Sequence, residues 1–158
     1  MRISTPSLLV VAAFALAVVA LAPSCARKMS HPVVRASWTL TPGALNANVT
    51  QANIRDTICT HGWTGTIRPP SSYTNELKRD GMRAYGLSGG PGDYQEDHLI
   101  SLELGGDPID PRNLWPEPYP RAAEVDRIEN ELNSDVCSGK LTLSEAQRRE
   151  SALKHRDG

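Results

Sequence analysis

Residues 94–117 read YQEDHLISLELGGDPIDPRNLWPE and combine features that an ordinary strand–turn–strand does not need. An acidic residue and a histidine, Asp97 and His98, end an extended arm, and a double glycine follows in the next turn. Further along, Asn113 stands between Pro111 and Pro116. Because polar residues of these kinds are concentrated in one short segment, the sequence indicates that the chemistry of the chain lies here.

The elements around this stretch predict an α+β fold. Residues 93–104 predict two short extended arms, residues 105–112 a loop and residues 113–115 a strand. A helix is predicted at residues 120–138, where apolar residues recur every three or four positions. Those residues are Val125, Ile128, Leu132 and Val136. The order is therefore a hairpin followed by a helix.

The flanking segments are predicted to be mostly helical. Thr50 and Ser72 are suitable N-caps, Thr142 and Glu145 form a capping box, and Gly81 is expected to end a helix. Trp63 and Trp115 are expected to be core aromatics. The predicted elements are helices at 51–59, 73–79 and 143–155 and a short strand at 63–68.

Over about residues 94–135 the chain resembles the HNH, or ββα-metal, nuclease superfamily. The residues that carry the resemblance are Asp97-His98 at the end of the first strand, Gly105-Gly106 in the loop and Asn113-Leu114 at the second strand. The full string is also similar to small exported bacterial HNH-like proteins that are uncharacterised. The resemblance implies a ββα-metal core at residues 94–138, with flanking N- and C-terminal helices, in a single domain at 49–158. Ser101 departs from the proline that many members have at this point.

The resemblance implies roles in phosphodiester hydrolysis. His98 would be the general base, since histidine titrates near neutral pH, and Asp97 would be a metal ligand. Asn113 would either fix the His98 ring or touch the metal. The favoured ion is Mg²⁺, with Mn²⁺, Ni²⁺ and Zn²⁺ as alternatives.

The chain departs from the superfamily at the last histidine of the motif name, because no histidine lies between His98 and His155. That histidine normally binds the metal from the helix. Carboxylates also serve hard cations, so an acidic residue is expected to replace it. Glu117 is preferred and Asp126 comes second, with Glu124 also available.

Four basic residues in the middle section are hypothesised to contact phosphates, against the alternative of a solvated charged face. They are Arg68, Lys78, Arg79 and Arg83. The 158 residues carry a formal net charge of −1, so the chain lacks the strong positive charge of many nucleic-acid-binding proteins. A nucleic acid partner, with DNA favoured, would therefore be bound locally or through a metal ion. No protein partner is inferred.

The N-terminus predicts export. Residues 1–26 read as a signal peptide, with Arg2 before an unbroken apolar run at 8–22 that is too short for a membrane span. Cys25 lies in a lipobox-like context, so lipidation at Cys25 is weighed against plain cleavage after Ala26. Residues 27–48 are predicted to be a flexible tether. The protein is expected to be periplasmic, secreted or anchored to the cell envelope by lipid.

Cys59 and Cys137 are predicted to form a disulfide, because an exported chain with two remaining cysteines most simply pairs them. The alternative is two unrelated buried thiols. The favoured function is an exported, metal-dependent endonuclease that hydrolyses DNA, with RNA also considered, without sequence specificity. One alternative is a non-catalytic cell-envelope scaffold or binding module on a degenerate HNH-like fold. A structural calcium site using Asp107, Asp110 and Glu117 ranks last, since their spacing lacks the EF-hand pattern.

Overall fold

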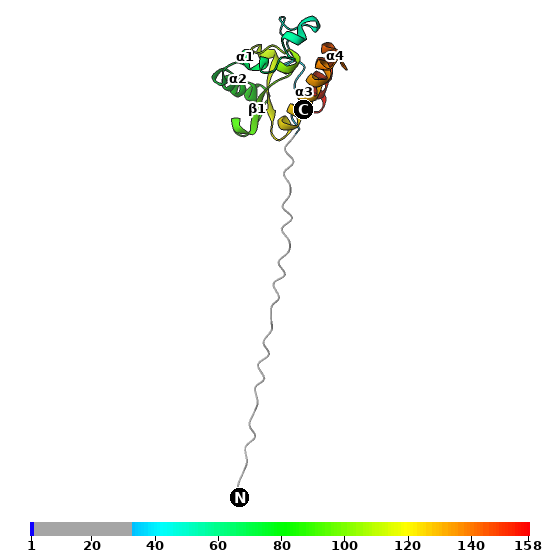
Figure 1. Cartoon of the computed structure of the whole chain (residues 1–158). Helices are drawn as coiled ribbons and strands as arrows, with labels where there is room; N and C mark the ends of the chain where they lie inside the picture. The colour runs from blue at the N-terminus through cyan, green and yellow to red at the C-terminus, as the bar shows by residue number, and fades with distance from the viewer. Residues whose placement is uncertain (2–32) are drawn as a thin grey trace. The chain divides into compact units, whose positions relative to one another are not determined.

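A computed structural model describes Met1 and residues 33–158 of the chain (Figure 1). The apolar run at 8–22, Cys25 and residues 27–32 of the predicted tether lie outside the described residues. Among the described residues, no helix has the length and apolar character required to cross a membrane.

Residues 33–158 combine helices with a two-stranded sheet, which confirms the predicted α+β class. The α-helices are α1 (Trp63–Ile67), α2 (Ser71–Ala84), α3 (Arg121–Cys137) and α4 (Leu143–Arg156), and the strands are β1 (Tyr94–His98) and β2 (Leu114–Pro118). The 3₁₀ helices are η1 (Gln51–Asp56), η2 (Pro91–Asp93), η3 (Leu102–Leu104) and η4 (Pro111–Asn113).

The two strands pair in an antiparallel hairpin, with Tyr94 opposite Pro118 and His98 opposite Leu114. Figure 1 shows the strands between α2 on one side and α3 with α4 on the other. Both α2 and α3 contact both strands. Trp115, opposite Asp97, is fully buried, as expected for a core aromatic. The helices therefore enclose the end of β1 that carries the polar residues.

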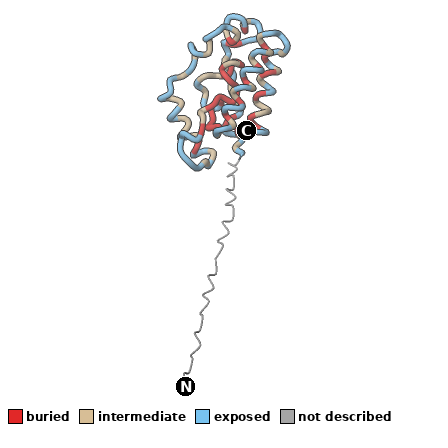
Figure 2. Tube along the Cα trace, turned by 60° about the horizontal axis from the view of Figure 1, so that its bottom comes forward, coloured by how far each residue is buried: buried red, intermediate tan, exposed pale blue. Residues whose placement is uncertain are grey.

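The main core lies where α3 and α4 meet η1 and η3, and the buried stretches gather there in Figure 2. Apolar residues at periodic positions of α3 and α4 supply much of it, as the helical spacing predicted. Cys59 and Cys137 form a disulfide beside this core, across a sequence separation of 78 residues, which confirms the predicted pair. On the chain-entropy model, closing a loop of that size contributes roughly 4 kcal/mol to stability.

The strand predicted at 63–68 is wrong, since these residues form helix α1. Gly62 precedes the helix with a φ of 79°, in the left-handed region that suits glycine. The backbone N–H of Arg68 then donates to the carbonyl of Thr64, which closes one helical turn. The alternation of polar and apolar residues looked like a strand, but the sheet consists of β1 and β2 alone within residues 33–158.

Gly81 does not end the second predicted helix, because α2 continues through Gly81 to Ala84. The helix also begins earlier than predicted, directly after Pro70. A Cβ atom at position 81 would lie 2.9 Å from Cδ of Pro116 on β2. The missing side chain therefore lets the helix approach the hairpin. The helix predicted at 51–59 was too long, because it is the shorter 3₁₀ helix η1. The second extended arm predicted within residues 93–104 is wrong, since residues 99–104 form a bend followed by the 3₁₀ helix η3.

The tether prediction is wrong for residues 33–48, which pack onto the domain. The backbone N–H of Ala36 donates to the carbonyl of Lys154 at 3.0 Å, and Leu45 forms a β-bridge with Gly106. Ala36 and Thr41 are buried. This segment therefore belongs to the domain and connects the end of α4 to the loop between the strands.

Helices α3 and α4 follow the predicted bounds within one or two residues. The predicted capping box opens α4: the Thr142 hydroxyl accepts from the backbone N–H of Glu145, and the Glu145 carboxylate accepts from the N–H of Thr142. From this fixed start, α4 runs so that Lys154 in its last turns reaches Asp97 and His98 at the end of β1.

Candidate functional site

A small pocket of about 60 Å³ lies at the end of β1, where a histidine meets several carboxyl groups. Strand β1 supplies Asp97 and His98, and helix α3 supplies Asp126. With Arg68, four residues that the sequence predicted as functional share this pocket. The full lining consists of Arg68, Gln95, Asp97, His98, Ser101, Leu102, Glu103, Asp126 and Glu129.

Asp97, Asp126 and Glu129 form an acidic cluster, with one oxygen of each lying within 4.8 Å of the others. Asp126 and Glu129 are three residues apart on α3 and therefore share a helix face. Asp97 and Glu129 are buried, whereas Asp126 is half-buried and accepts a hydrogen bond from the Gln95 amide at 3.0 Å. Carboxylate oxygens are the ligands that hard divalent cations prefer, so this cluster could hold one.

Lys154, fully buried near the end of α4, contacts the same cluster from inside the protein. Its ammonium group donates to Asp97 Oδ2 at 2.7 Å, to Glu129 Oε1 at 2.5 Å and to the carbonyl oxygen of His98 at 2.5 Å. Glu150 Oε1 lies 3.4 Å away. These contacts use one oxygen of each carboxyl group and leave the other free of Lys154.

In this network, burial and the charge of Lys154 act on the carboxyl groups in opposite directions. Burial alone would lower the pKa of Lys154, but the surrounding carboxylates raise it well above its usual value. Burial would raise the pKa of Asp97, but the charge and hydrogen bond of Lys154 lower it instead. Burial raises the pKa of Glu117 to about 9, and it also raises the pKa values of Glu129 and Glu150. Lys154 and Asp97 thus form an ion pair, and burial opposes the ionisation of the three neighbouring glutamates.

His98 is buried, and its Nε2 lies 3.2 Å from the carbonyl oxygen of Pro108. Burial lowers the pKa of this imidazole, although the Pro108 carbonyl and the Asp97 charge oppose the shift. The neutral ring is therefore favoured near neutral pH. A neutral ring that donates through Nε2 keeps Nδ1 as its basic nitrogen, which is the state that a general base requires.

Asn113 contacts neither the His98 ring nor the acidic cluster, contrary to both of its predicted roles. Its oxygen accepts from the backbone N–H of Ile100 at 2.9 Å, and its NH₂ group donates to the carbonyls of Ile100 and Asp107, each at 3.0 Å. Gly106 permits this arrangement, because a Cβ there would lie 2.7 Å from Asn113 Nδ2. Asp107 immediately precedes Pro108, so Asn113 supports His98 only through the loop backbone.

Glu117 is corrected as the preferred replacement for the missing histidine. It is fully buried on β2, and its carboxyl group interacts with that of Asp97 through charge and a side-chain hydrogen bond. Glu129 occupies the third position of the cluster instead. The spacing of Asp126 and Glu129 on one face of the predicted helix could have identified it, whereas nothing in the sequence marked Lys154.

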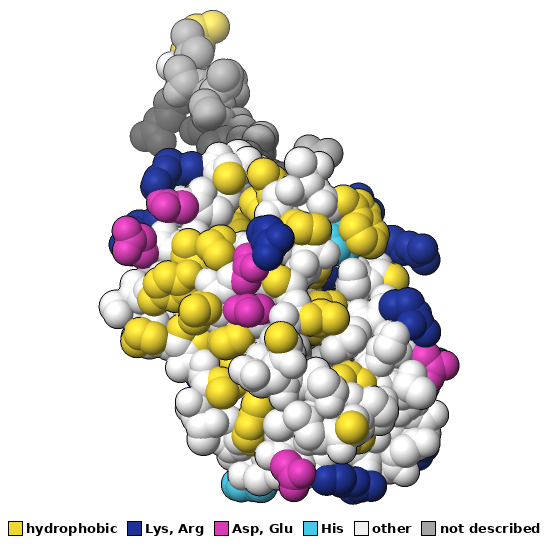
Figure 3. Space-filling view, turned by 90° about the horizontal axis from the view of Figure 1, so that it is seen from above, with side chains coloured by type: hydrophobic (Ala, Val, Ile, Leu, Met, Phe, Trp, Pro, Cys, Tyr) yellow, Lys and Arg dark blue, Asp and Glu magenta, His cyan; other side chains and the backbone are white. Residues whose placement is uncertain are grey.

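The four predicted phosphate contacts do not form one patch. Arg68 lines the pocket, but the Lys78 ammonium donates to the carbonyls of Pro91 and Tyr94 at 3.3 and 3.0 Å and so holds the start of β1. The remaining two lie on α2: Arg83 pairs with Asp80, and Arg79 is exposed. On the face seen in Figure 3, basic side chains are likewise scattered.

The chain matches no family model, no curated protein and no solved structure. The superfamily resemblance of residues 94–135 therefore stays a prediction.

Proposed function

We propose that the protein is an exported, metal-dependent endonuclease of HNH type that hydrolyses phosphodiester bonds in DNA, and in RNA as a second substrate. The observation that carries this proposal is that His98 lines the same small pocket as Asp97, Asp126 and Glu129. The hairpin followed by α3 would then be a ββα-metal core.

The proposed ligands fit a hard divalent cation. All three offer carboxylate oxygens, and Mg²⁺ or Mn²⁺ suits such donors better than Ni²⁺ or Zn²⁺ does. Asp126 is half-buried, which leaves one side of the cluster open to substrate. When bound, the cation would polarise the scissile phosphate and stabilise its developing negative charge. Because ligands must be ionised, cation binding would favour the ionised form of Glu129, against the burial that raises its pKa.

The other groups of the pocket would support hydrolysis. His98, held through Nε2 by the Pro108 carbonyl, would take a proton from the attacking water at Nδ1. Arg68 at the pocket would attract a phosphate of the substrate. Lys154 would hold Asp97 and the His98 backbone in place.

Export and low specificity are part of the proposal. A disulfide between Cys59 and Cys137 is typical of an oxidising compartment, in agreement with the signal peptide predicted at residues 1–26. The protein would be periplasmic, secreted, or lipid-anchored through Cys25. Sequence-specific cleavage needs contacts to base edges, and the pocket lining supplies a single basic side chain, Arg68.

Cleavage of supercoiled plasmid by the purified, oxidised protein tests the proposal. The assay would include Mg²⁺, Mn²⁺, Ni²⁺, Zn²⁺ or EDTA, and would compare His98→Ala with His61→Ala, an exposed histidine outside the pocket. We expect metal-dependent nicking that disappears in EDTA and in His98→Ala but persists in His61→Ala. Equal nicking by folded His98→Ala, or no cleavage of DNA or RNA with any metal, would favour the non-catalytic envelope scaffold.

A further inference from the structure

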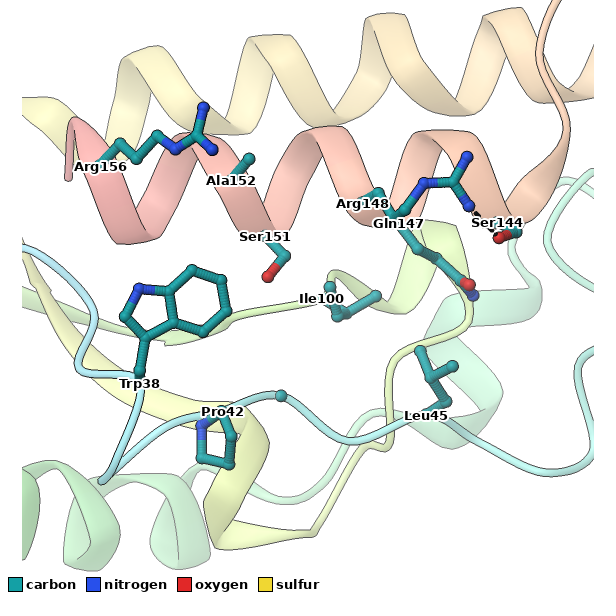
Figure 4. A pocket seen from close by; sticks show the side chains of 11 residues that line it. Trp38, Pro42, Leu45, Ile100, Ser144, Gln147, Arg148, Ser151, Ala152 and Arg156 are labelled. Atoms are coloured by element: carbon teal, nitrogen blue, oxygen red, sulfur yellow. Dashed lines mark hydrogen bonds between the residues drawn. The ribbon is translucent and has the colours of Figure 1, made fainter.

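A larger hollow of about 700 Å³ lies between the segment that contains Trp38 and helix α4 (Figure 4). Figure 4 shows the Trp38 indole on the wall opposite α4, with Ser151 facing into the space and Ile100 behind it. Arg148 and Arg156 of α4 lie along the rim. We call this hollow the Trp38 groove.

The Trp38 ring is a fixed and accessible platform. The residue is 62% exposed, although its ring stacks on His155 with centroids 3.5 Å apart and planes within 4°. His155 is itself buried, with Nε2 3.1 Å from the Thr41 carbonyl, to which its N–H can donate, and Nδ1 3.2 Å from the Ser151 hydroxyl, which can donate to it. One face of the indole is thus supported by an immobile ring, and the remaining surface of the indole is left for a ligand.

The charges of the Trp38 groove favour an anion. Its lining contains Arg148 and Arg156 and no acidic residue. The guanidinium group of Arg35 donates to the backbone carbonyl of Arg156, which brings a third positive charge to that end. Eight residues separate the two lining arginines on α4, so they lie about 12 Å apart along the helix axis. The groove therefore combines a flat aromatic surface with separated positive charges.

We propose that the Trp38 groove binds an unpaired nucleotide of a single-stranded nucleic acid, with its base stacked on Trp38 and its phosphates at Arg148 and Arg156. Stacking on an aromatic side chain is available to every unpaired base, whereas a duplex keeps its bases inside and would offer only phosphates. An acidic peptide matches the charge but lacks a flat ring for the indole. The inference rests on the proposed function in one respect: the bound strand would belong to the nuclease substrate.

Fluorescence polarisation in EDTA measures this binding without cleavage. The probe is a labelled single-stranded DNA of about twelve nucleotides, within the range of known single-strand site sizes. Trp38→Ala is expected to weaken binding about 5- to 150-fold, whereas Trp38→Phe retains most of the affinity. Replacing both lining arginines by glutamine should reduce the slope of log affinity against log salt by about 1.4. Arg149→Gln, on the same helix but outside the groove, should match the wild type.

Three results would overturn the inference: unchanged affinity in a folded Trp38→Ala variant, equal binding of duplex and single strand, or equally effective competition by an acidic peptide. Its failure is distinguishable from failure of the proposed function. If His98→Ala abolishes cleavage while Trp38→Ala binds normally, only the groove assignment is wrong. If no metal supports cleavage but binding depends on Trp38, the nuclease proposal fails and the groove remains.

Discussion

The ammonium nitrogen of Lys154 lies 2.7 Å from Asp97 Oδ2, although the two residues are 57 positions apart in the chain. The same nitrogen contacts Glu129 and the His98 carbonyl. The candidate site is therefore complete only when the last helix is docked on the hairpin. A cation built into the protein balances part of the negative charge that the cluster would otherwise carry.

Replacing Lys154 by methionine should destabilise the protein by about 3–5 kcal/mol, because it leaves the buried Asp97 charge without its partner. Urea unfolding of the oxidised protein in EDTA measures the change. Lys140→Met is the matched control, since Lys140 pairs with Asp135 at the surface and such pairs contribute about 0–1 kcal/mol. Equal stability of the two variants would show that Lys154 does not compensate Asp97.

Proline at position 101, common among members of the superfamily that the chain resembles, should destabilise this protein. The backbone N–H of Ser101 donates to Glu150 Oε1 at 2.9 Å, and both groups are buried. Ser101→Pro removes that donor, at a cost of about 1–3 kcal/mol. Ser101→Ala should change stability by less than about 0.5 kcal/mol, because the buried Ser101 hydroxyl has no hydrogen-bond partner within residues 33–158. Thermal unfolding of both variants checks this, and a stable Ser101→Pro would contradict it.

The metal-free protein should become more stable as the pH falls from about 8 to about 6.5. Burial raises the pKa of Glu117 from an ordinary 4.5 to about 9. In this window the folded state keeps a proton on Glu117 that the unfolded chain has released, so Glu117 alone raises the free energy of unfolding by up to about 1.4 kcal/mol per pH unit. Glu96, whose pKa burial raises to about 8, acts in the same direction. His98, whose pKa is lowered from 6.5, opposes this effect mainly below that window.

Urea unfolding in EDTA across these pH values measures the slope. Glu117→Gln should reduce the slope by up to about 1.4 kcal/mol per pH unit, because the amide does not titrate, while Glu96 keeps its own contribution. A wild-type protein that loses stability as the pH falls through the window would contradict the prediction, as would an unchanged slope in Glu117→Gln.

The sequence was sufficient to predict those parts of the fold that depend on residues close together in the chain. The capping box at Thr142 and Glu145 opened α4 as expected, and the apolar spacing gave α3. The cysteine count and the predicted export gave the disulfide. Four residues named as candidates from the sequence line one pocket in the structure: Arg68, Asp97, His98 and Asp126. In each case the information lies in a few residues or in a simple count.

The errors involve residues whose state depends on distant packing. Lys154 lies in a basic helix end that reads as solvated, and only the docking of α4 on β1 buries it. Gly81 resembles a helix breaker in the sequence, but in the structure it lies within α2, where its missing side chain leaves room for Pro116. Asn113 had the residue type of a site residue, but the loop backbone uses its hydrogen-bonding groups.

The central claim, a cation held by the acidic cluster beside His98, is tested most directly by the dependence of plasmid cleavage on Mn²⁺ concentration. The comparison is between the wild type, Asp126→Asn and Glu124→Gln, an exposed acid on the same helix outside the cluster. We predict that Asp126→Asn requires at least about tenfold more Mn²⁺ for half-maximal cleavage, while Glu124→Gln follows the wild-type curve. Superimposed curves for all three proteins, or cleavage that survives EDTA, would contradict the assignment.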